Sequence, residues 1–261
     1  MIIGTGRMAR LLARTFKSIA EVSITSPISG EAEKPAKKLR VKQANPEDAK
    51  DYDFILLAVS PLRLKEVALG IARHLKPGAV VMDISSVKKG FVEEVLEVLP
   101  SDVGYVSLHP LFGPSVKRIE KETVVVIPIR GEWATNAVLE LVRSLGLRAV
   151  ISSVEEHDKV MSIVQVAHHL SYLAYAMTLA KSLDLELIER YATRSLRYTL
   201  WMLKRMSKNL GVIREIQELN VYGQGAKAKL LENLKRLSEI NKSAWRDAEE
   251  ALKLLTSLKL N

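Results

Sequence analysis

The chain has 261 residues and contains no cysteine. This absence excludes a disulfide framework, a thiolate metal site and a cysteine nucleophile. Aromatic residues are scarce, with three Trp, seven Tyr and four Phe, and no basic run is interleaved with them. Because proteins that bind single-stranded nucleic acid stack bases on aromatic side chains within basic grooves, we expect no nucleic-acid partner.

The chain opens with MIIGTGRMAR, an apolar stretch too short for a signal peptide or a membrane span. We therefore expect a cytoplasmic protein. The net charge is +9, yet the basic residues are scattered and only residues 34–42, KPAKKLRVK, form a dense run. We interpret this charge as a solvated surface that also attracts small anionic ligands.

The first half of the chain alternates short apolar segments with amphipathic ones. Strands are expected over MII and over residues 21–26, 53–59, 79–85, 105–109, 123–129 and 148–153. Helical spacing of apolar residues separates most of them. This alternation predicts an α/β domain over residues 1–152, a Rossmann-type, doubly wound parallel sheet with helices on both faces.

The second half, residues 153–261, shows no convincing strand and predicts an all-α domain. Residues 155–183 read as one long helix that is apolar nearly all round, and such a helix must be buried. A domain of about 110 residues has little room to surround it. We therefore expect this domain to form a homodimer, with residues 185–208 and 226–258 as outer amphipathic helices.

The segment GTGRMA, residues 4–9, follows the first strand and opens a helix. Gly4 permits a tight turn, Gly6 lets a pyrophosphate approach the backbone, and Ala9 allows close helix–strand packing. The pattern indicates a dinucleotide site. Its expected cofactor-binding residues are Gly4, Thr5, Gly6, Arg7, Met8 and Ala9, together with Ser26, Ser60 and Pro61 at strand ends.

The second strand bears on the choice of dinucleotide. An acid about 20 residues beyond the glycines would bind the ribose 2′-hydroxyl of NAD. Here the strand ends at Thr25 and Ser26, which carry hydroxyls and no carboxylate, and basic residues follow at 34, 37 and 38. This pattern favours NADP over NAD.

Ligands of open α/β sheets bind at the carboxyl ends of the strands, where Ser85, Ser86 and His109 are expected. A histidine at a strand end is more often structural than catalytic. A serine on the neighbouring strand favours the catalytic interpretation, because it can hydrogen-bond and orient an imidazole. No spacing of ligands indicates a metal site, and we expect none.

Four segments, GTGRMA, DISSVK, HPLFGP and EEHDKVMSIVQVAHHL, resemble the prephenate/arogenate dehydrogenases of tyrosine biosynthesis. The resemblance extends over approximately residues 1–225. Its most specific part is the His-Pro-x-x-Gly loop, followed some 48 residues later by Glu-His-Asp on a helix. It implies a prephenate dehydrogenase that oxidatively decarboxylates prephenate to 4-hydroxyphenylpyruvate, with hydride transfer to NAD(P)+.

The resemblance also implies roles for individual residues. His109 would be the catalytic base and Ser86 its hydrogen-bonding partner near the substrate hydroxyl. Arg205 would hold the ring carboxylate of the substrate. The remaining substrate-binding residues would be His169, Gln165 and Ser85, and Asn220 also matches the family pattern. The family's Ser-Asp-Pro and Trp after the arginine are replaced here by SKNLGVI, so the edge of the substrate pocket differs.

Two alternatives stay open at this point. Arogenate dehydrogenase performs the same reaction on arogenate, which has an amino-acid side chain where prephenate has a keto-acid side chain. A non-catalytic, dinucleotide-sensing dimer is the alternative of another class, and the intact set of Ser86, His109, His169 and Arg205 argues against it. The pair His157–Asp158 reads as a helix-start pair that caps and orients.

Overall fold

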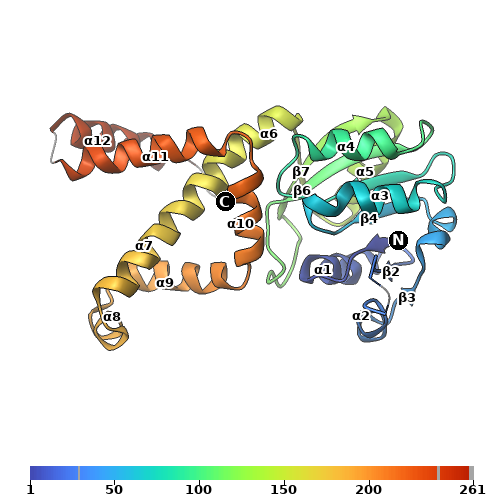
Figure 1. Ribbon diagram of the computed structural model, residues 1–261, viewed down its shortest axis with the longest axis horizontal. Helices are drawn as coiled ribbons and strands as arrows, with labels where there is room; N and C mark the ends of the chain where they lie inside the picture. The colour runs from blue at the N-terminus through green and yellow to red at the C-terminus, as the bar shows by residue number, and fades with distance from the viewer. Residues whose placement is uncertain (29, 240–241, 259–261) are drawn as a thin grey trace. The chain divides into compact units, whose positions relative to one another are not determined.

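The computed structural model describes residues 1–28, 30–239 and 242–258. The chain divides into two compact units, Met1–Asp158 and the residues from Lys159 onward. The described part of the first unit is a sheet covered by helices, and that of the second is helical (Figure 1). The boundary expected after residue 152 stays a prediction.

The sheet of the first unit has eight strands in the order β3-β2-β1-β4-β5-β6-β7-β8 (Figure 1). Their bounds are β1 Ile2–Ile3, β2 Ser23–Thr25, β3 Lys42–Gln43, β4 Phe54–Leu57, β5 Val80–Asp83, β6 Gly104–Pro110, β7 Thr123–Arg130 and β8 Arg148–Ile151. The direction of strand order reverses between β1 and β4. In doubly wound sheets such a reversal opens a crevice at the carboxyl ends of the strands, where ligands bind.

Helices cover both faces of this sheet. They are α1 Arg7–Phe16, α2 Glu33–Leu39, α3 Leu64–Ala72, α4 Phe91–Val98 and α5 Glu132–Ser144, with short 3₁₀ turns η1 Pro46–Asp51 and η2 Pro61–Arg63. On one face, Val67 of α3 and Val95 of α4 share a buried cluster with Val81 of β5. On the other, Leu12 of α1 and Val138 of α5 pack in a second cluster. The prediction of a Rossmann-type domain, with helices on both faces of the sheet, is confirmed.

Two details of the sheet differ from the prediction of a parallel sheet. β7 runs antiparallel to β6, and β8 runs parallel to β7. The reason lies in the connection, because residues 111–122 contain no helix to carry the chain across for a parallel return. The basic run at residues 34–42 also forms most of α2 and the start of β3, elements that the sequence reading did not assign.

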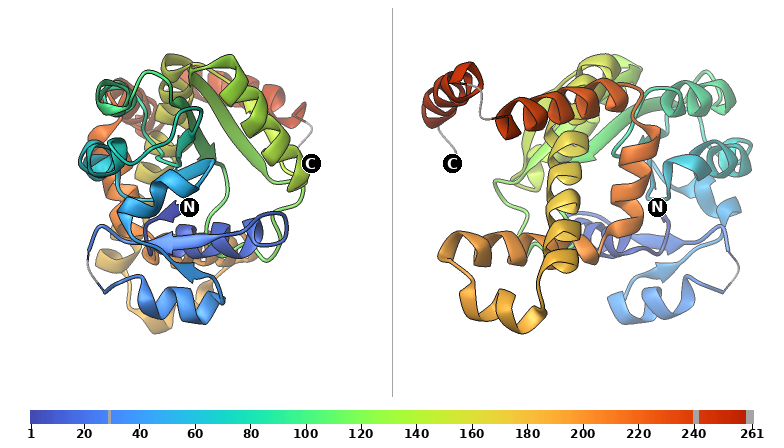
Figure 2. Two further views of the ribbon diagram at one scale, coloured as in Figure 1. Left: turned by 90° about the vertical axis from the view of Figure 1, so that its right-hand side faces the viewer. Right: turned by 60° about the vertical axis from the view of Figure 1, so that its left-hand side comes forward.

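The helices after β8 are α6 Val154–Met161, the π-helical turn η3 Ser162–Ala167, α7 His168–Ser182, α8 Leu185–Tyr191, α9 Arg194–Ser207, α10 Leu210–Leu219, α11 Gly223–Ser238 and α12 Lys242–Thr256 (Figure 2). The single helix expected over 155–183 is therefore interrupted by a widened turn. The segment 185–208 is also two helices, because Thr193 starts α9 by accepting the N–H of Leu196 at its hydroxyl. The segment 226–258 contributes to α11 and α12, and its residues 240–241 lie outside the described residues.

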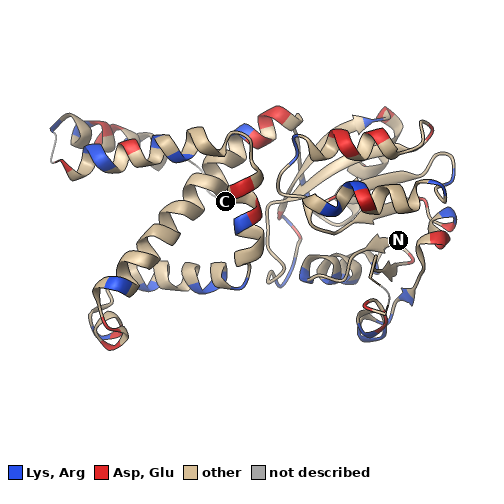
Figure 3. Ribbon diagram, viewed as in Figure 1, with Lys and Arg blue, Asp and Glu red and all other residues tan. Residues whose placement is uncertain are grey.

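Helix α7 is apolar, as expected, but no residue of it is buried within the chain. Tyr175 and Met177 are 43% and 58% exposed. Lys181 is the one charged residue on this helix, which Figure 3 shows as an almost uncharged ribbon. On α9, Tyr198 and Trp201 are also exposed, so they do not form a core of the single chain. Over the described range, none of the helices combines the length and the hydropathy needed to cross a membrane.

Gly4 offers a test of the turn that follows β1. Its φ is +132°, and a Cβ built there would lie 2.3 Å from the carbonyl oxygen of Ala58. We expect Gly4→Ala to lower the free energy of unfolding by about 2 kcal/mol, measured by denaturant titration. Gly70→Ala, on the exposed face of α3 with open space around it, should instead raise stability by about 1 kcal/mol. Equal effects of the two substitutions would contradict the strain at Gly4.

Candidate active site

The glycine loop joins β1 to the N-terminus of α1. The N–H of Gly4 donates to the carbonyl of Thr25 at 2.9 Å and ties the loop to the end of β2. Gly6 precedes the first residue of α1, and a Cβ placed on it would meet nothing within 4 Å. The space before the helix N-terminus is therefore open, and Ala9 is fully buried against the sheet. A pyrophosphate fits this arrangement, since the N–H groups and the positive end of the dipole at a helix N-terminus attract anions.

The end of β2 contains a group that sequence reasoning missed. The hydroxyl of Ser26 donates to the carboxylate of Glu31 at 3.1 Å, and the hydroxyl of Thr5 lies 3.5 Å from the same carboxylate. Glu31 is outside the strand, five residues past Ser26, so the search for an acid at the strand end overlooked it. A carboxylate here can accept a ribose hydroxyl and repels a 2′-phosphate. Of the other expected cofactor residues, Ser60 is half-buried before η2 and Pro61 is buried within it.

A buried ion pair lies where β5 and β6 end. The ammonium of Lys88 is 3.1 Å from the Asp83 carboxylate, and neither side chain is exposed. Lys88 Nζ also donates to the carbonyl of Leu108 at 2.7 Å and to the hydroxyl of Ser85 at 3.2 Å. The Asp83 carboxylate accepts further hydrogen bonds from Ser85 and from the phenol of Tyr105. Every polar group of this pair is satisfied within the protein.

The electrostatics of this cluster follow from burial. Burial alone would raise the pKa of Asp83, but the charge of Lys88 and the hydrogen bonds from Ser85 outweigh it and hold the pKa below its usual value. Burial raises the pKa of Tyr105 well above its usual value, and the neighbouring Asp83 carboxylate adds to the effect. Asp83 is therefore ionised and Tyr105 is a neutral donor at neutral pH.

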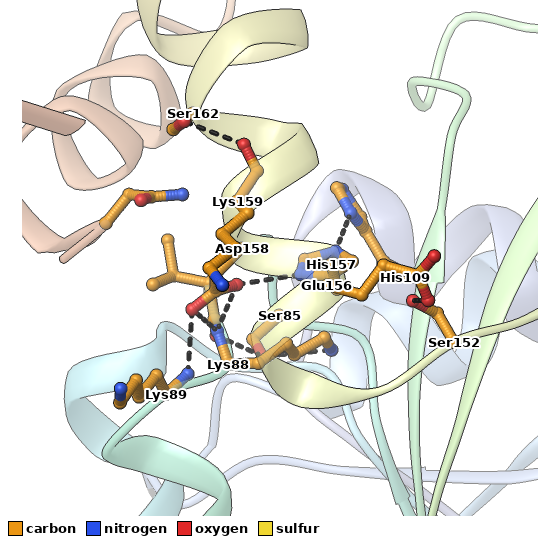
Figure 4. A network of polar contacts seen from close by, with 12 residues as sticks. Ser85, Lys88, Lys89, His109, Ser152, Glu156, His157, Asp158, Lys159 and Ser162 are labelled. Carbon is orange, nitrogen blue, oxygen red and sulfur yellow. Dashed lines mark hydrogen bonds and ion pairs between the residues drawn. The ribbon is translucent and has the colours of Figure 1, made fainter. Parts of the chain in front are cut away.

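His109 lies near the end of β6 and heads a chain of hydrogen bonds (Figure 4). Its Nδ1 is 2.8 Å from Nε2 of His157, whose Nδ1 is 2.7 Å from the carboxylate of Asp158. The same carboxylate accepts the backbone N–H groups of Lys88, at 3.1 and 3.2 Å, and of Lys89, at 2.9 Å. His109, His157 and Asp158 are all buried. Helix α6 is capped separately, by the Ser153 hydroxyl on the N–H of Glu156.

The network assigns the protons. An ionised Asp158 only accepts, so Nδ1 of His157 carries a proton and its Nε2 is the acceptor. Nδ1 of His109 must then donate to His157, which leaves Nε2 of His109 as the unprotonated nitrogen. Burial, followed by the nearby His157 and the charge of Lys88, lowers the pKa of His109 well below its usual value. The imidazole of His109 is thus neutral and can accept a proton at Nε2.

The serines of the DISSVK segment occupy different environments. Ser85 is buried, and its hydroxyl is bonded to Asp83 and to the carbonyl of Val87. Ser86 is half-buried in the loop between β5 and Lys88. The partner that the structure gives Nδ1 of His109 is His157. The roles expected for Ser85 at the substrate and for Ser86 beside His109 stay predictions.

The remaining predicted residues lie in the second unit. Gln165 belongs to η3, and His169 follows in the first turn of α7. The wide turn is supported from α10, where the amide of Gln217 donates to the carbonyl of Val166 at 2.8 Å. Nδ1 of His169 is buried and has no hydrogen-bond partner within the described residues. π-Helical turns are frequent at functional sites, and this one contains Gln165 and ends two residues before His169.

Arg205 and Asn220 complete the set. The guanidinium of Arg205 lies over the ring of Trp201, one turn earlier on α9, with its carbon 4.7 Å from the ring centre. Asn220 is buried after α10, and its side-chain oxygen accepts the N–H of Tyr222 at 2.9 Å. Among the described residues, no group of three or more His, Asp or Glu side chains is arranged to hold a metal ion.

Comparisons with known proteins identify the family. The prephenate dehydrogenase nucleotide-binding domain matches residues 12–151, and the prephenate dehydrogenase dimerization domain matches residues 153–258. A probable arogenate/prephenate dehydrogenase of Methanocaldococcus jannaschii is 26% identical over 98% of this chain and 58% of its own length. The chain thus spans about three-fifths of that relative.

Two crystal structures of prephenate dehydrogenase from Aquifex aeolicus share the fold. One has a TM-score of 0.77 at 20% identity and covers 98% of this chain and 97% of that one. The other, in complex with hydroxyphenyl propionate and NAD+, has a TM-score of 0.74 at 21% identity and covers 98% and 94%. Since family models match the sequence on both sides of residue 152, the chain belongs to the prephenate dehydrogenase family.

Proposed function

We propose that this protein oxidatively decarboxylates prephenate to 4-hydroxyphenylpyruvate, with NAD(P)+ as the hydride acceptor. The observation that carries the proposal is the buried chain His109–His157–Asp158, which leaves Nε2 of His109 as an acceptor. The same unit holds the open glycine loop before α1, which fits a dinucleotide. A base and a hydride acceptor are the two groups that the reaction requires.

The chemistry needs little beyond positioning and one proton transfer. Prephenate has a ring hydroxyl opposite a quaternary carbon that bears a carboxylate. When bound, the nicotinamide supplies the acceptor for the carbinol hydride. Nε2 of His109 takes the hydroxyl proton, carbon dioxide leaves from the quaternary carbon, and the ring becomes aromatic. Because aromatisation makes the step strongly downhill, the protein need only hold the substrate and remove the proton.

The second histidine and the aspartate serve the base. His157 and Asp158 fix the ring of His109 and the nitrogen that carries its proton. Once His109 is protonated, the Asp158 carboxylate stabilises the positive charge through the bridging imidazole. Serine hydrolases use a carboxylate behind a histidine in the same way.

The substrate's two carboxylates need cationic partners. Arg205 suits the ring carboxylate because its planar guanidinium binds a carboxylate through two parallel hydrogen bonds. Stacking on Trp201 limits the directions in which that guanidinium can point. Gln165 within the π-helical turn and His169 just after it are proposed to line the pocket, and the net charge of +9 attracts the dianion.

For the cofactor we propose NADP as the preferred dinucleotide. Ser26 and Thr25 at the end of β2 carry hydroxyls, and the exposed Lys34 and Lys38 of α2 follow close in sequence. Glu31 acts in the opposite direction, because its carboxylate lies against Ser26 and favours a 2′-hydroxyl. The preference is therefore the balance of these charges.

We further propose that the protein acts as a homodimer. Helix α7 has no residue buried within the chain, although it is apolar over most of its surface. The dimerization-domain match covers this helix. A second copy of the same face would bury these side chains, which is the usual arrangement for symmetric oligomers. A cytoplasmic location stays a prediction.

Initial rates with prephenate and with arogenate, each with NAD+ and NADP+, test the proposal. We expect turnover with prephenate and the higher kcat/KM with NADP+. His109→Asn should reduce kcat at least about 1000-fold, because the base is lost, and should leave cofactor binding by calorimetry unchanged. Turnover with arogenate alone would name the other substrate. Tight cofactor binding without turnover on any pair would favour a dinucleotide sensor.

Asp158→Asn tests the proton assignment. An amide can donate to His157 where the carboxylate only accepts, so the favoured tautomer of both imidazoles reverses. We expect kcat to fall about 100-fold or more, with cofactor affinity unchanged. Glu156→Gln is the matched control, because this carboxylate is on the same helix and is exposed. Similar activity in the two variants would contradict the assignment.

Arg205→Gln tests the substrate carboxylate site. We expect KM for prephenate to rise about 10-fold to 100-fold, because a charge-assisted pair is lost, while the Kd of the cofactor stays the same. The neighbouring Lys204→Gln removes the same charge from the next position on α9 and should change KM by less than about threefold. An equal rise in both would show a general charge effect.

A further inference from the structure

We propose that Lys88 is a positioning residue for His109, which fixes the end of β6 and keeps a positive charge beside the imidazole. The inference rests on the proposed role of His109 as the base and adds a residue that acts through it. Lys88 lies in the loop after β5, 21 residues before His109 in sequence, and its side chain is completely buried.

The side chain of Lys88 contacts the backbone of β6. Nζ of Lys88 donates to the carbonyl of Leu108 at 2.7 Å, and Leu108 immediately precedes His109. This is the shortest of the three hydrogen bonds that the ammonium makes. It fixes the peptide plane from which the imidazole projects.

Lys88 also contacts the hydrogen-bond chain that holds the imidazole ring. The backbone N–H of Lys88 donates to the Asp158 carboxylate, which holds His157, which in turn holds Nδ1 of His109. Lys88 therefore supports His109 in two ways. Its Nζ holds the backbone at Leu108, and its N–H binds Asp158, which supports the ring through His157 (Figure 4). The result is a closed ring of contacts within the first unit.

The hydrogen bonds of Lys88 indicate that its side chain is a charged ammonium. Nζ has three acceptors, the Asp83 carboxylate, the Ser85 hydroxyl and the Leu108 carbonyl, which matches the three hydrogens of an ammonium. A neutral amine would leave one acceptor without a donor. Burial lowers the pKa of Lys88, and the Asp83 carboxylate opposes that fall. The ammonium lies between this carboxylate and the carbonyl of Leu108, the residue that precedes His109.

The ionisable groups joined to His109 by these contacts come from β5, the loop after it and α6. Lys88 and Asp83 come from β5 and its following loop, and His157 and Asp158 from α6. On β7, the residue paired with His109 is the apolar Val125. Besides burial, the nearby His157 and the charge of Lys88 lower the pKa of His109, so His109 stays neutral into acidic conditions. Lys88 is thereby one of the groups that keep the base unprotonated, after burial and His157.

The test compares two double variants with the wild type. Asp83→Asn with Lys88→Met removes the whole ion pair and avoids an unbalanced buried charge. Asp83→Asn with Lys88→Gln also removes both charges but keeps a donor for the Leu108 carbonyl. The titration of His109, followed by ¹⁵N NMR without substrate, is the first readout, and the acid limb of kcat/KM is the second.

We expect His109 to titrate at higher pH in both double variants than in the wild type. The acid limb should move with it, so that kcat/KM on that limb falls about tenfold for each pH unit of displacement. If His109 titrates in the double variant Asp83→Asn with Lys88→Gln as it does in the wild type, only the hydrogen bond to Leu108 matters. That result would overturn the role of charge. If neither double variant folds, the measurement is made on the wild type alone. A wild-type His109 that titrates near its ordinary pKa would also overturn the role of charge. Because NMR needs no turnover, failure of the proposed reaction remains distinguishable.

Discussion

The Asp158 carboxylate is the group on which the proposed chemistry depends, because it joins three segments that are distant in sequence. It accepts the backbone N–H groups at 88 and 89, it belongs to α6, and through His157 it reaches β6. One ionised acceptor thus determines which nitrogen of each imidazole is protonated. The unprotonated nitrogen of His109 and the orientation of its ring both follow from it.

A second constraint is the expense of burying charge. Lys88, Asp83 and Asp158 are all fully buried, and removing one partner of such a pair typically destabilises by about 3–5 kcal/mol. Apolar residues of similar volume would often hold a fold as well, so stability alone does not explain the ion pair. Its contacts with the backbone before His109 and with Asp158 give it a use in positioning the base.

Much of this organisation can be predicted from sequence, because local patterns carry it. The βα alternation, the loop at Gly4–Ala9 and the strand-end position of His109 depend on neighbours within a few residues. The antiparallel β7 could not be predicted, since TVVVIPI suits a strand of either direction. The turn at 162–167 depends on Gln217, 51 residues from the carbonyl it supports, and His157 is 48 residues from His109. Such partners are brought together only by the fold.

The proposed chemistry requires His109 to present an unprotonated Nε2. Long-range ¹H–¹⁵N correlation spectra of the imidazole side chains at neutral pH measure this directly, with His109→Asn for assignment. We expect a pyrrole-like, protonated Nδ1 and a pyridine-like Nε2 for His109, and a protonated Nδ1 for His157. A protonated Nε2 on His109, or a fully protonated imidazolium, would contradict it.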